Sequence, residues 1–258
     1  MACVRTYGKC YVQTIARWIP MYPGVLVALL TVGVCFGGGV VPIHAHMPQA
    51  SNQTFPTDFY GVDVSDPVSE SAFACLEAAN LQFAIVRCYQ SLGHVDPACA
   101  ASVAAAHQGG LKAVHAYMFP CPKCGDPEGQ VKTLQSYFKE NQVNVTRLWL
   151  DIEDTSYWPT SATDSQAIYR ALVDACTSLG LVCGVYSNQN EWSSIFGSAA
   201  FSYGATLPLW YAHYDGQPTF DDFIPFGGWG RPTIKQFNDQ GAKCGVSYDL
   251  NWSPSLPL

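Results

Sequence analysis

Residues 148–154 read Leu-Trp-Leu-Asp-Ile-Glu-Asp, a short apolar run that ends in three acidic side chains. A run of this length, rich in large apolar residues, is typical of a buried strand. Amphipathic stretches lie on both sides of it, since residues 127–140 and 165–179 each place apolar side chains on one face of a helix. A buried strand between two helices indicates a βαβ arrangement and therefore a parallel sheet.

The same alternation extends along most of the chain. Further strands are expected at residues 60–65, 83–87, 111–119, 181–186, 207–212, 233–237 and 246–250, and further helices at 69–80 and 97–108. Eight strands alternating with helices over about 200 residues predict an α/β fold, a closed TIM-like (β/α) barrel. The last third has few helix signals and many Gly and Pro residues, so we expect an irregular barrel there. No linker divides it, which indicates a single domain.

The start of the chain has the features of an export signal. Residues 1–57 contain three basic residues and no acidic one, and an apolar run at 25–36 is followed by small residues up to Ala45. These are the parts of a secretory signal peptide. We expect a leader at 1–45, a short extension at 46–58 and the barrel domain at 59–258. The domain would then be secreted or lie in a lysosome or phagosome lumen, without stable membrane insertion; an uncleaved signal anchor is the alternative.

The cysteines agree with export. Of eleven cysteines, three lie in the leader and eight follow it. An even number of thiols in an exported chain indicates disulfides. The pair Cys121 and Cys124 has the spacing of half a zinc knuckle, but no second CxxC or suitably spaced His pair completes a metal site. We therefore expect a disulfide-stabilised domain without a metal, in which the connectivity is left open.

Four acidic residues are expected at one end of the barrel. In such barrels the chemistry lies at the carboxyl ends of the strands, where we place Asp63, Asp151, Glu153 and Asp249. Side chains alternate along a strand, so Asp151 and Glu153 share a face. Their repulsion raises one pKa, and a protonated carboxyl group beside an ionised one is the pair that hydrolyses a glycosidic bond. The longer Glu153 is the expected general acid and Asp151 the ionised partner; a solvated strand end or a calcium ligand set is the alternative for the D-x-E pattern alone.

The surrounding motifs make this pattern more specific. They lie, in order, at residues 60–65, 116–119, 149–153, 208–214, 234–237 and 245–251. This series resembles glycoside hydrolase family 25, the lysozymes of the Chalaropsis type, over residues 59–253. The stretches 84–91, 118–121 and 225–229 are similar to the branch of that family found in amoebae and nematodes. Met118 departs from the pattern, because bacterial members more often have His there.

The resemblance implies an activity and a set of site residues. Family members cleave the β-1,4 bond between N-acetylmuramic acid and N-acetylglucosamine in bacterial peptidoglycan, with no metal or cofactor. Their four active-site carboxylates match Asp63, Asp151, Glu153 and Asp249, with Glu153 as the general acid. Their substrate groove matches Tyr117, Trp210, Tyr214 and Gln236. Whether a carboxylate or the acetamido group of the substrate is the nucleophile is left open.

Other functions fit less well. A net charge of −7 without a basic cluster argues against nucleic acid as a partner. A chitin-type glycosidase of family 18 also has D-x-E on the fourth strand, but it needs acids two and five residues before Asp151, where this chain has Trp149 and Thr146. A carbohydrate-binding barrel without activity would have lost one of the four carboxylates. We therefore expect a secreted or lysosomal muramidase, monomeric and most active at roughly pH 4–6.

Overall fold

The computed structural model describes residues 5–6, 9–10 and 58–258. The expected leader (1–45) and extension (46–58) lie almost wholly outside these residues and stay predictions. Within the leader, the two-residue strands β1 (Arg5–Thr6) and β2 (Lys9–Cys10) pair antiparallel. Among the residues described, no helix is both long and apolar enough to cross a membrane.

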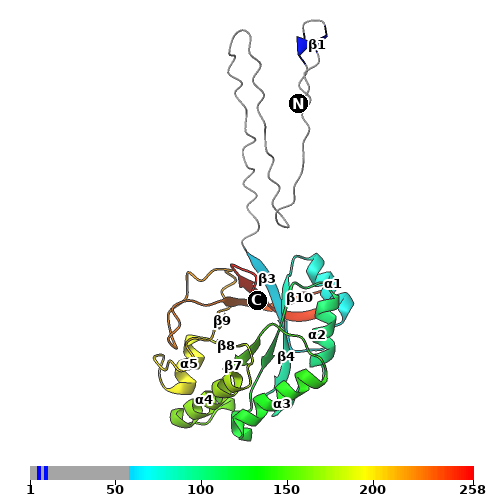
Figure 1. Ribbon diagram of the computed structural model, residues 1–258. Helices are drawn as coiled ribbons and strands as arrows, with labels where there is room; N and C mark the ends of the chain where they lie inside the picture. The colour runs from blue at the N-terminus through cyan, green and yellow to red at the C-terminus, as the bar shows by residue number, and fades with distance from the viewer. Residues whose placement is uncertain (1–4, 7–8, 11–57) are drawn as a thin grey trace. The chain divides into compact units, whose positions relative to one another are not determined.

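Eight strands form a closed barrel, which confirms the predicted fold class (Figure 1). They are β3 (Phe59–Val64), β4 (Phe83–Gln90), β6 (Ala113–Met118), β7 (Leu148–Asp151), β8 (Cys183–Ser187), β9 (Leu209–Ala212), β10 (Ile234–Lys243) and β11 (Val246–Ser253). Pairing of β3 with β4 closes the ring, and the short β5 (His94–Val95) pairs antiparallel with the end of β4. Each predicted strand has a counterpart because each is a buried apolar run bounded by turn residues.

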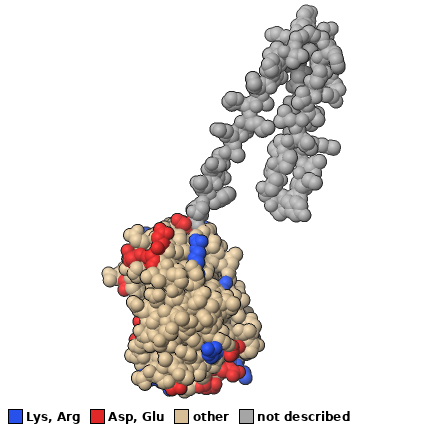
Figure 2. Space-filling model, turned by 90° about the vertical axis from the view of Figure 1, so that its left-hand side faces the viewer, with Lys and Arg blue, Asp and Glu red and all other residues tan. Residues whose placement is uncertain are grey.

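Helices cover the first two thirds of the barrel from outside (Figure 1). They are α1 (Glu70–Ala78), α2 (Cys99–Gln108), α3 (Pro127–Glu140), α4 (Ala162–Ser178) and α5 (Gln189–Phe196), with the short 3-10 turns η1 (Pro122–Cys124) and η2 (Thr155–Tyr157). The sequence analysis missed α5, which has eight residues. Between α5 and β10 the described chain has no helix, and apart from β9 it runs as loops, in agreement with the irregular last third. The surface is sparsely charged, and on the face shown in Figure 2 the Asp and Glu residues gather in small groups.

One strand runs against the prediction of an all-parallel sheet. Strand β11 is antiparallel to both of its neighbours, β10 and β3. The chain reverses between β10 and β11 at Cys244 and Gly245, whose φ angles of 58° and 76° lie in the left-handed region. Such a two-residue hairpin joins antiparallel strands, whereas a parallel return needs a crossover of a dozen or more residues. The segment between these strands is too short for one.

Large rings fill the barrel interior opposite glycines. A Cβ atom on Gly184 would lie 2.3 Å from the ring of Trp149, and one on Gly61 would lie 2.5 Å from the ring of Phe83. Trp149 is fully buried and donates to Nδ1 of His115 (2.9 Å). The structure therefore places Trp149 in the core and not on a sugar-binding surface. His115 is a core residue too, and burial lowers its pKa to about 4.

Four disulfides join the eight cysteines of the barrel domain, as expected for an exported chain. They are Cys75–Cys244, Cys88–Cys99, Cys121–Cys124 and Cys176–Cys183. The CxxC pair is thus a disulfide. Cys75–Cys244 spans 169 residues and ties helix α1 to the turn of the β10–β11 hairpin.

We predict that the double variant Cys75→Ser/Cys244→Ser loses more stability than Cys121→Ser/Cys124→Ser. A cross-link that closes a longer loop removes more entropy from the unfolded chain, and a typical disulfide contributes about 2–4 kcal/mol. For a domain of this size the melting temperature should fall by about 5–15 °C. Calorimetry of both variants measures this, and a larger fall for the short-loop variant would contradict the prediction.

Candidate active site

Carboxyl groups from three parts of the barrel meet at one end. Asp63 is the penultimate residue of β3, and Asp151 is the last residue of β7. Glu153 lies two residues past β7, so it is not on the strand itself as we expected. Asp249 pairs with Asp63 in the register between β11 and β3. Because β11 is antiparallel, Asp249 reaches this end from the first half of its strand and not from its carboxyl end.

The backbone that carries Glu153 is held by its neighbours. Ser187 Oγ donates to the carbonyl oxygen of Ile152 (2.8 Å), and Trp158 Nε1 donates to the carbonyl oxygen of Glu153 (3.1 Å). Trp158 is 2% exposed. These contacts fix the segment after β7, so Glu153 has a defined position although no strand pairing holds it.

An amide network joins two of the carboxylates. Gln236 Nε2 donates to Asp63 Oδ1 (2.8 Å) and Asp249 Oδ2 (3.0 Å). Asn251 Nδ2 donates to the same Asp63 oxygen (2.7 Å), and Trp210 Nε1 donates to Asn251 Oδ1 (2.7 Å). Trp210, expected in the groove, is 2% exposed and supports Asn251 from inside the barrel.

Two tyrosines complete the network on the other side of Gln236. The hydroxyl groups of Tyr186 and Tyr214 both donate to Gln236 Oε1, at 2.6 and 2.9 Å. This fixes the orientation of the amide, since its oxygen faces the tyrosines and its nitrogen faces the acids. Tyr214 is 49% exposed and Tyr117 is partly buried, so both present surface at the barrel mouth.

Burial raises the pKa of the clustered carboxyl groups. The pKa of Glu153 rises to about 7, first through burial and then through the negative charges of Glu191, Asp154 and Asp249. The pKa of Asp249 rises to about 6 through burial and the charge of Asp239. Glu153 therefore holds its proton up to about neutral pH, as a general acid must.

The other two carboxyl groups differ in their hydrogen bonds. Burial and the charge of Asp249 raise the pKa of Asp63 to about 7, although the bonds from Asn251 and Gln236 favour its anion. Burial, with the charges of Glu153 and Asp63, raises the pKa of Asp151 well above its usual range, and Asp151 Oδ1 has no partner among the described residues. We expected Asp151 to be the ionised member. Its burial favours the neutral form instead, and Asp249, whose pKa of about 6 is lower than that of Asp63 and Glu153, is better placed to carry negative charge.

A cavity of about 330 Å³ adjoins two of these carboxyl groups, Asp63 and Asp249. It is lined by Asp63, Ser65, Asp66, Tyr117, Asp239, Gln240, Gly241, Ala242, Ser247, Tyr248 and Asp249. Residues of the β10–β11 hairpin make up one wall. The site is thus an open, acidic pocket bordered by tyrosines, which is suited to a polyhydroxylated ligand.

Comparison with known proteins identifies the family. A family model described as Lysozyme-like protein 1 matches residues 54–237. Probable GH family 25 lysozyme 2 of Dictyostelium discoideum is 44% identical over 194 residues, which cover 75% of this chain and 90% of that protein. The chain belongs to glycoside hydrolase family 25. It is a glycoside hydrolase of the lysozyme type.

Further comparisons agree with this family 25 assignment. Lysozyme-like protein 5 of Caenorhabditis elegans is 38% identical over 197 residues, covering 75% of this chain and 91% of that protein. The structure of a family GH25 lysozyme from Aspergillus fumigatus has the same fold, with a TM-score of 0.62 at 21% identity over 76% of this chain and 93% of that one. The family resemblance predicted from the motifs is confirmed.

The family 25 domain has a fifth acidic group that the sequence analysis missed. Glu191 lies in the first turn of α5, where its backbone N–H donates to Asn188 Oδ1 (3.0 Å). Its Oε2 atom is buried without a partner in the described structure. Of the neighbouring charges, that of Glu191 has the largest effect on Glu153. The Asn188-x-x-Glu191 spacing is that of a helix N-cap and could have revealed α5.

An ion-pair cluster holds the loop that carries Tyr214. The buried ammonium group of Lys235 bonds Asp215 (2.9 Å) and Asp222 (2.7 Å), and His213 also contacts Asp222. The ligand atoms of His213, Asp215 and Asp222 lie close enough to hold a metal ion. However, Lys235 already supplies a positive charge to both aspartates. We therefore assign this cluster a structural role.

We predict that Glu191→Gln lowers the pKa of Glu153 from about 7 towards its ordinary value of 4.5, because the variant removes a negative charge that opposes ionisation. The midpoint should move by about one pH unit. Titration of the Glu153 carboxyl carbon by NMR measures it directly. Glu140→Gln, an exposed change at the end of α3, is the control. An unchanged midpoint in Glu191→Gln, or an equal shift in the control, would rule out this role.

Proposed function

We propose that this family 25 enzyme hydrolyses the β-1,4 bond between N-acetylmuramic acid and N-acetylglucosamine in bacterial peptidoglycan. The observation that supports this most directly is Glu153, a carboxyl group with a pKa of about 7 that lies near Asp249, a residue of the acidic pocket. Glycosidases need a protonated carboxyl group near neutral pH together with a second carboxyl group. The linked pair Asp63 and Asp249 meets the second requirement.

Glu153 acts as the general acid in this proposal. It donates its proton to the glycosidic oxygen as the bond to the leaving sugar breaks, and positive charge develops at the sugar carbon. Asp249, which accepts a hydrogen bond from Gln236 and has a lower pKa than Asp63, carries the negative charge that stabilises that positive charge. The amide thus keeps Asp63 and the ionised Asp249 close to each other and close to the reacting sugar.

Asp151 assists from the end of β7. Its Oδ1 atom is buried without a partner among the described residues, and a sugar that reached it would supply the missing hydrogen bond from the N–H of its 2-acetamido group. Holding that group would orient its carbonyl oxygen towards the reacting carbon. This favours the acetamido group, and not a carboxylate, as the internal nucleophile.

The remaining site residues bind the sugar chain. The exposed ring of Tyr214 offers an apolar face to a sugar ring, and Tyr117 borders the cavity. Gln236 and Trp210 are both 2% exposed, so they shape the groove through the residues that they hold. No step in this scheme requires a metal or cofactor.

The expected location follows from the chain's chemistry. Four disulfides are stable in oxidising compartments, which supports a secreted or lysosomal enzyme that has passed through a secretory route. The leader at residues 1–45 would supply the signal, and the mature domain would act as a monomer on bacterial walls.

We predict that Glu153→Gln lowers the rate of wall hydrolysis by roughly 10²–10⁴-fold, because an amide has no acidic proton to donate. Clearing of a bacterial wall suspension measures the rate, with Glu140→Gln as the matched control. Full activity of Glu153→Gln would assign the acid role to another carboxyl group. Wall binding without hydrolysis by the unaltered enzyme would instead indicate a carbohydrate-binding barrel.

We also predict the pH dependence. Glu153 must be protonated, so the rate falls above its pKa of about 7, and Asp249 must be ionised, so the rate falls below its pKa of about 6. The rate should therefore be highest between these values, which is less acidic than the sequence alone suggested. Initial rates on purified peptidoglycan from roughly pH 3 to 9 give the profile, and a maximum at about pH 8 would contradict this assignment.

A further inference from the structure

Arg87 lies on the inner face of the barrel, at its mouth. The inner side chains of β4 are Phe83 and Ile85, which pack inside the barrel, and Arg87 is the next residue on that face. It pairs with Tyr117 on β6, whereas Ile85 pairs with Asp63 on β3. Arg87 is two residues further along β4 than Ile85, which is level with Asp63, so it lies nearer to the barrel mouth than Asp63 does. Its neighbour Tyr117 lines the cavity.

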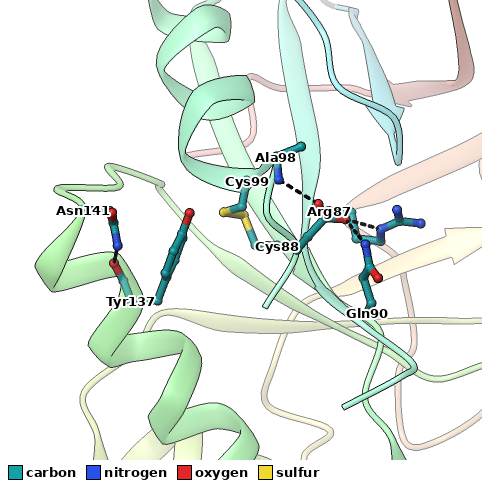
Figure 3. Close-up of a disulfide and its surroundings, with 8 residues drawn as sticks. Arg87, Cys88, Gln90, Ala98, Cys99, Tyr137 and Asn141 are labelled. Atoms are coloured by element: carbon teal, nitrogen blue, oxygen red, sulfur yellow. Dashed lines mark hydrogen bonds and ion pairs between the residues drawn. A yellow bond between two sulfur atoms is a disulfide. The ribbon is translucent and has the colours of Figure 1, made fainter. Parts of the chain in front are cut away.

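The guanidinium group is held at one atom. Arg87 Nε donates to Asp96 Oδ2 (2.7 Å), and Gln90 Nε2 donates to the same oxygen (2.9 Å). The second oxygen of Asp96 accepts from the backbone N–H of Ala98 (2.9 Å). The Asp96 side chain is 4% exposed. Figure 3 shows Arg87, Gln90 and Ala98 gathered around this carboxylate.

A disulfide fixes the two chain segments that carry these groups. Cys88 follows Arg87 on β4, and it is bonded to Cys99 at the start of α2, three residues past Asp96 (Figure 3). The ion pair and the disulfide hold the same two segments together. Arg87 is thus positioned by contacts behind it and not by the carboxylates of the site.

The other edge of the guanidinium group is free. Neither Nη1 nor Nη2 of Arg87 has a hydrogen-bond partner in the described part of the chain, and the side chain is 27% exposed. The negative charge of Asp66 acts on Arg87, but Asp66 makes no hydrogen bond to it. Two parallel N–H donors of arginine match a carboxylate or a carbonyl oxygen. The Nη1 and Nη2 donors of Arg87 are therefore held in position and available to bind a ligand that carries a carboxylate or a carbonyl group.

We propose that Arg87 binds the lactyl carboxyl group of N-acetylmuramic acid and so selects this sugar over N-acetylglucosamine. The inference rests on the proposed function and names the substrate group that is recognised. The two sugars differ by the lactyl ether, whose carboxyl group is either free or joined to the stem peptide through an amide. In both forms an oxygen accepts a hydrogen bond from the free edge of Arg87.

Binding of two disaccharides to the full chain tests this inference. N-acetylglucosaminyl-N-acetylmuramic acid carries the lactyl group, and N,N′-diacetylchitobiose lacks it. By calorimetry, the unaltered protein should bind the first about tenfold or more tightly than the second, as expected for a pair of charge-assisted hydrogen bonds. Arg87→Met should abolish this preference. Arg231→Met, a change in the loop before β10, is the control and should keep it.

A second variant guards against misfolding, since Arg87→Met leaves Asp96 without its ion pair. Arg87→Lys keeps a cation beside Asp96 but removes the two parallel N–H donors of the guanidinium group. This variant should lose most of the preference for the disaccharide with the lactyl group while still binding chitobiose. Equal affinities for both disaccharides in the unaltered protein, or a full preference in Arg87→Lys, would overturn the inference. Wall hydrolysis without an Arg87-dependent preference would leave the proposed function intact. A preserved preference without hydrolysis would overturn the function alone.

Discussion

The side-chain amide of Gln236 is the contact on which the mouth of the barrel depends. Carboxyl groups packed at one end of a barrel repel one another when ionised, and burial adds to that cost. Gln236 presents two N–H donors to Asp63 and Asp249, while its oxygen accepts from Tyr186 and Tyr214. A single neutral group thus offsets part of the repulsion and orients residues from four strands or their following loops. An ammonium group in its place would neutralise the acids and remove the raised pKa values that the chemistry needs.

The antiparallel strand β11 makes this arrangement possible. A parallel strand would present to the mouth the residues at its carboxyl end, whereas here a residue from the first half of the strand, Asp249, faces Asp63. The same reversal lets the β10–β11 hairpin become a wall of the cavity, and the Cys75–Cys244 bond ties the turn of that hairpin to α1. Fold and site are therefore coupled through one short turn, in which Cys244 and Gly245 both adopt positive φ angles.

The sequence predicted the eight strands and four of the five helices because these depend on local apolar patterns. It did not predict the direction of β11, since a buried strand has the same apolar pattern in either direction. The meeting of Asp63 with Asp249 was expected, but through strand ends and not through this reversal. The raised pKa of Asp151 was not predicted, because its burial and its lack of a partner among the described residues are properties of packing. Glu191 was missed for the same reason: its effect on Glu153 comes from a short helix that contacts the site in space.

The carboxyl groups at the barrel mouth limit which side chains can bind an anionic substituent of the substrate. Negative charge there is limited by burial, which keeps protons on the carboxyl groups and so avoids the full cost of several buried anions. The carboxyl groups of such a site accept hydrogen bonds from the hydroxyl groups of a sugar. An anionic substituent can bind there only if the site also holds a cation that is not paired with these carboxyl groups. Asp96 meets this condition by holding Arg87 at Nε, so that the guanidinium group is not paired with the clustered carboxyl groups Asp63, Asp151, Glu153 and Asp249. An acidic pocket can then accept an acidic substrate, because the cation on the inner face of β4 is bonded to Asp96 and makes no hydrogen bond to the acids of the described chain that line the pocket.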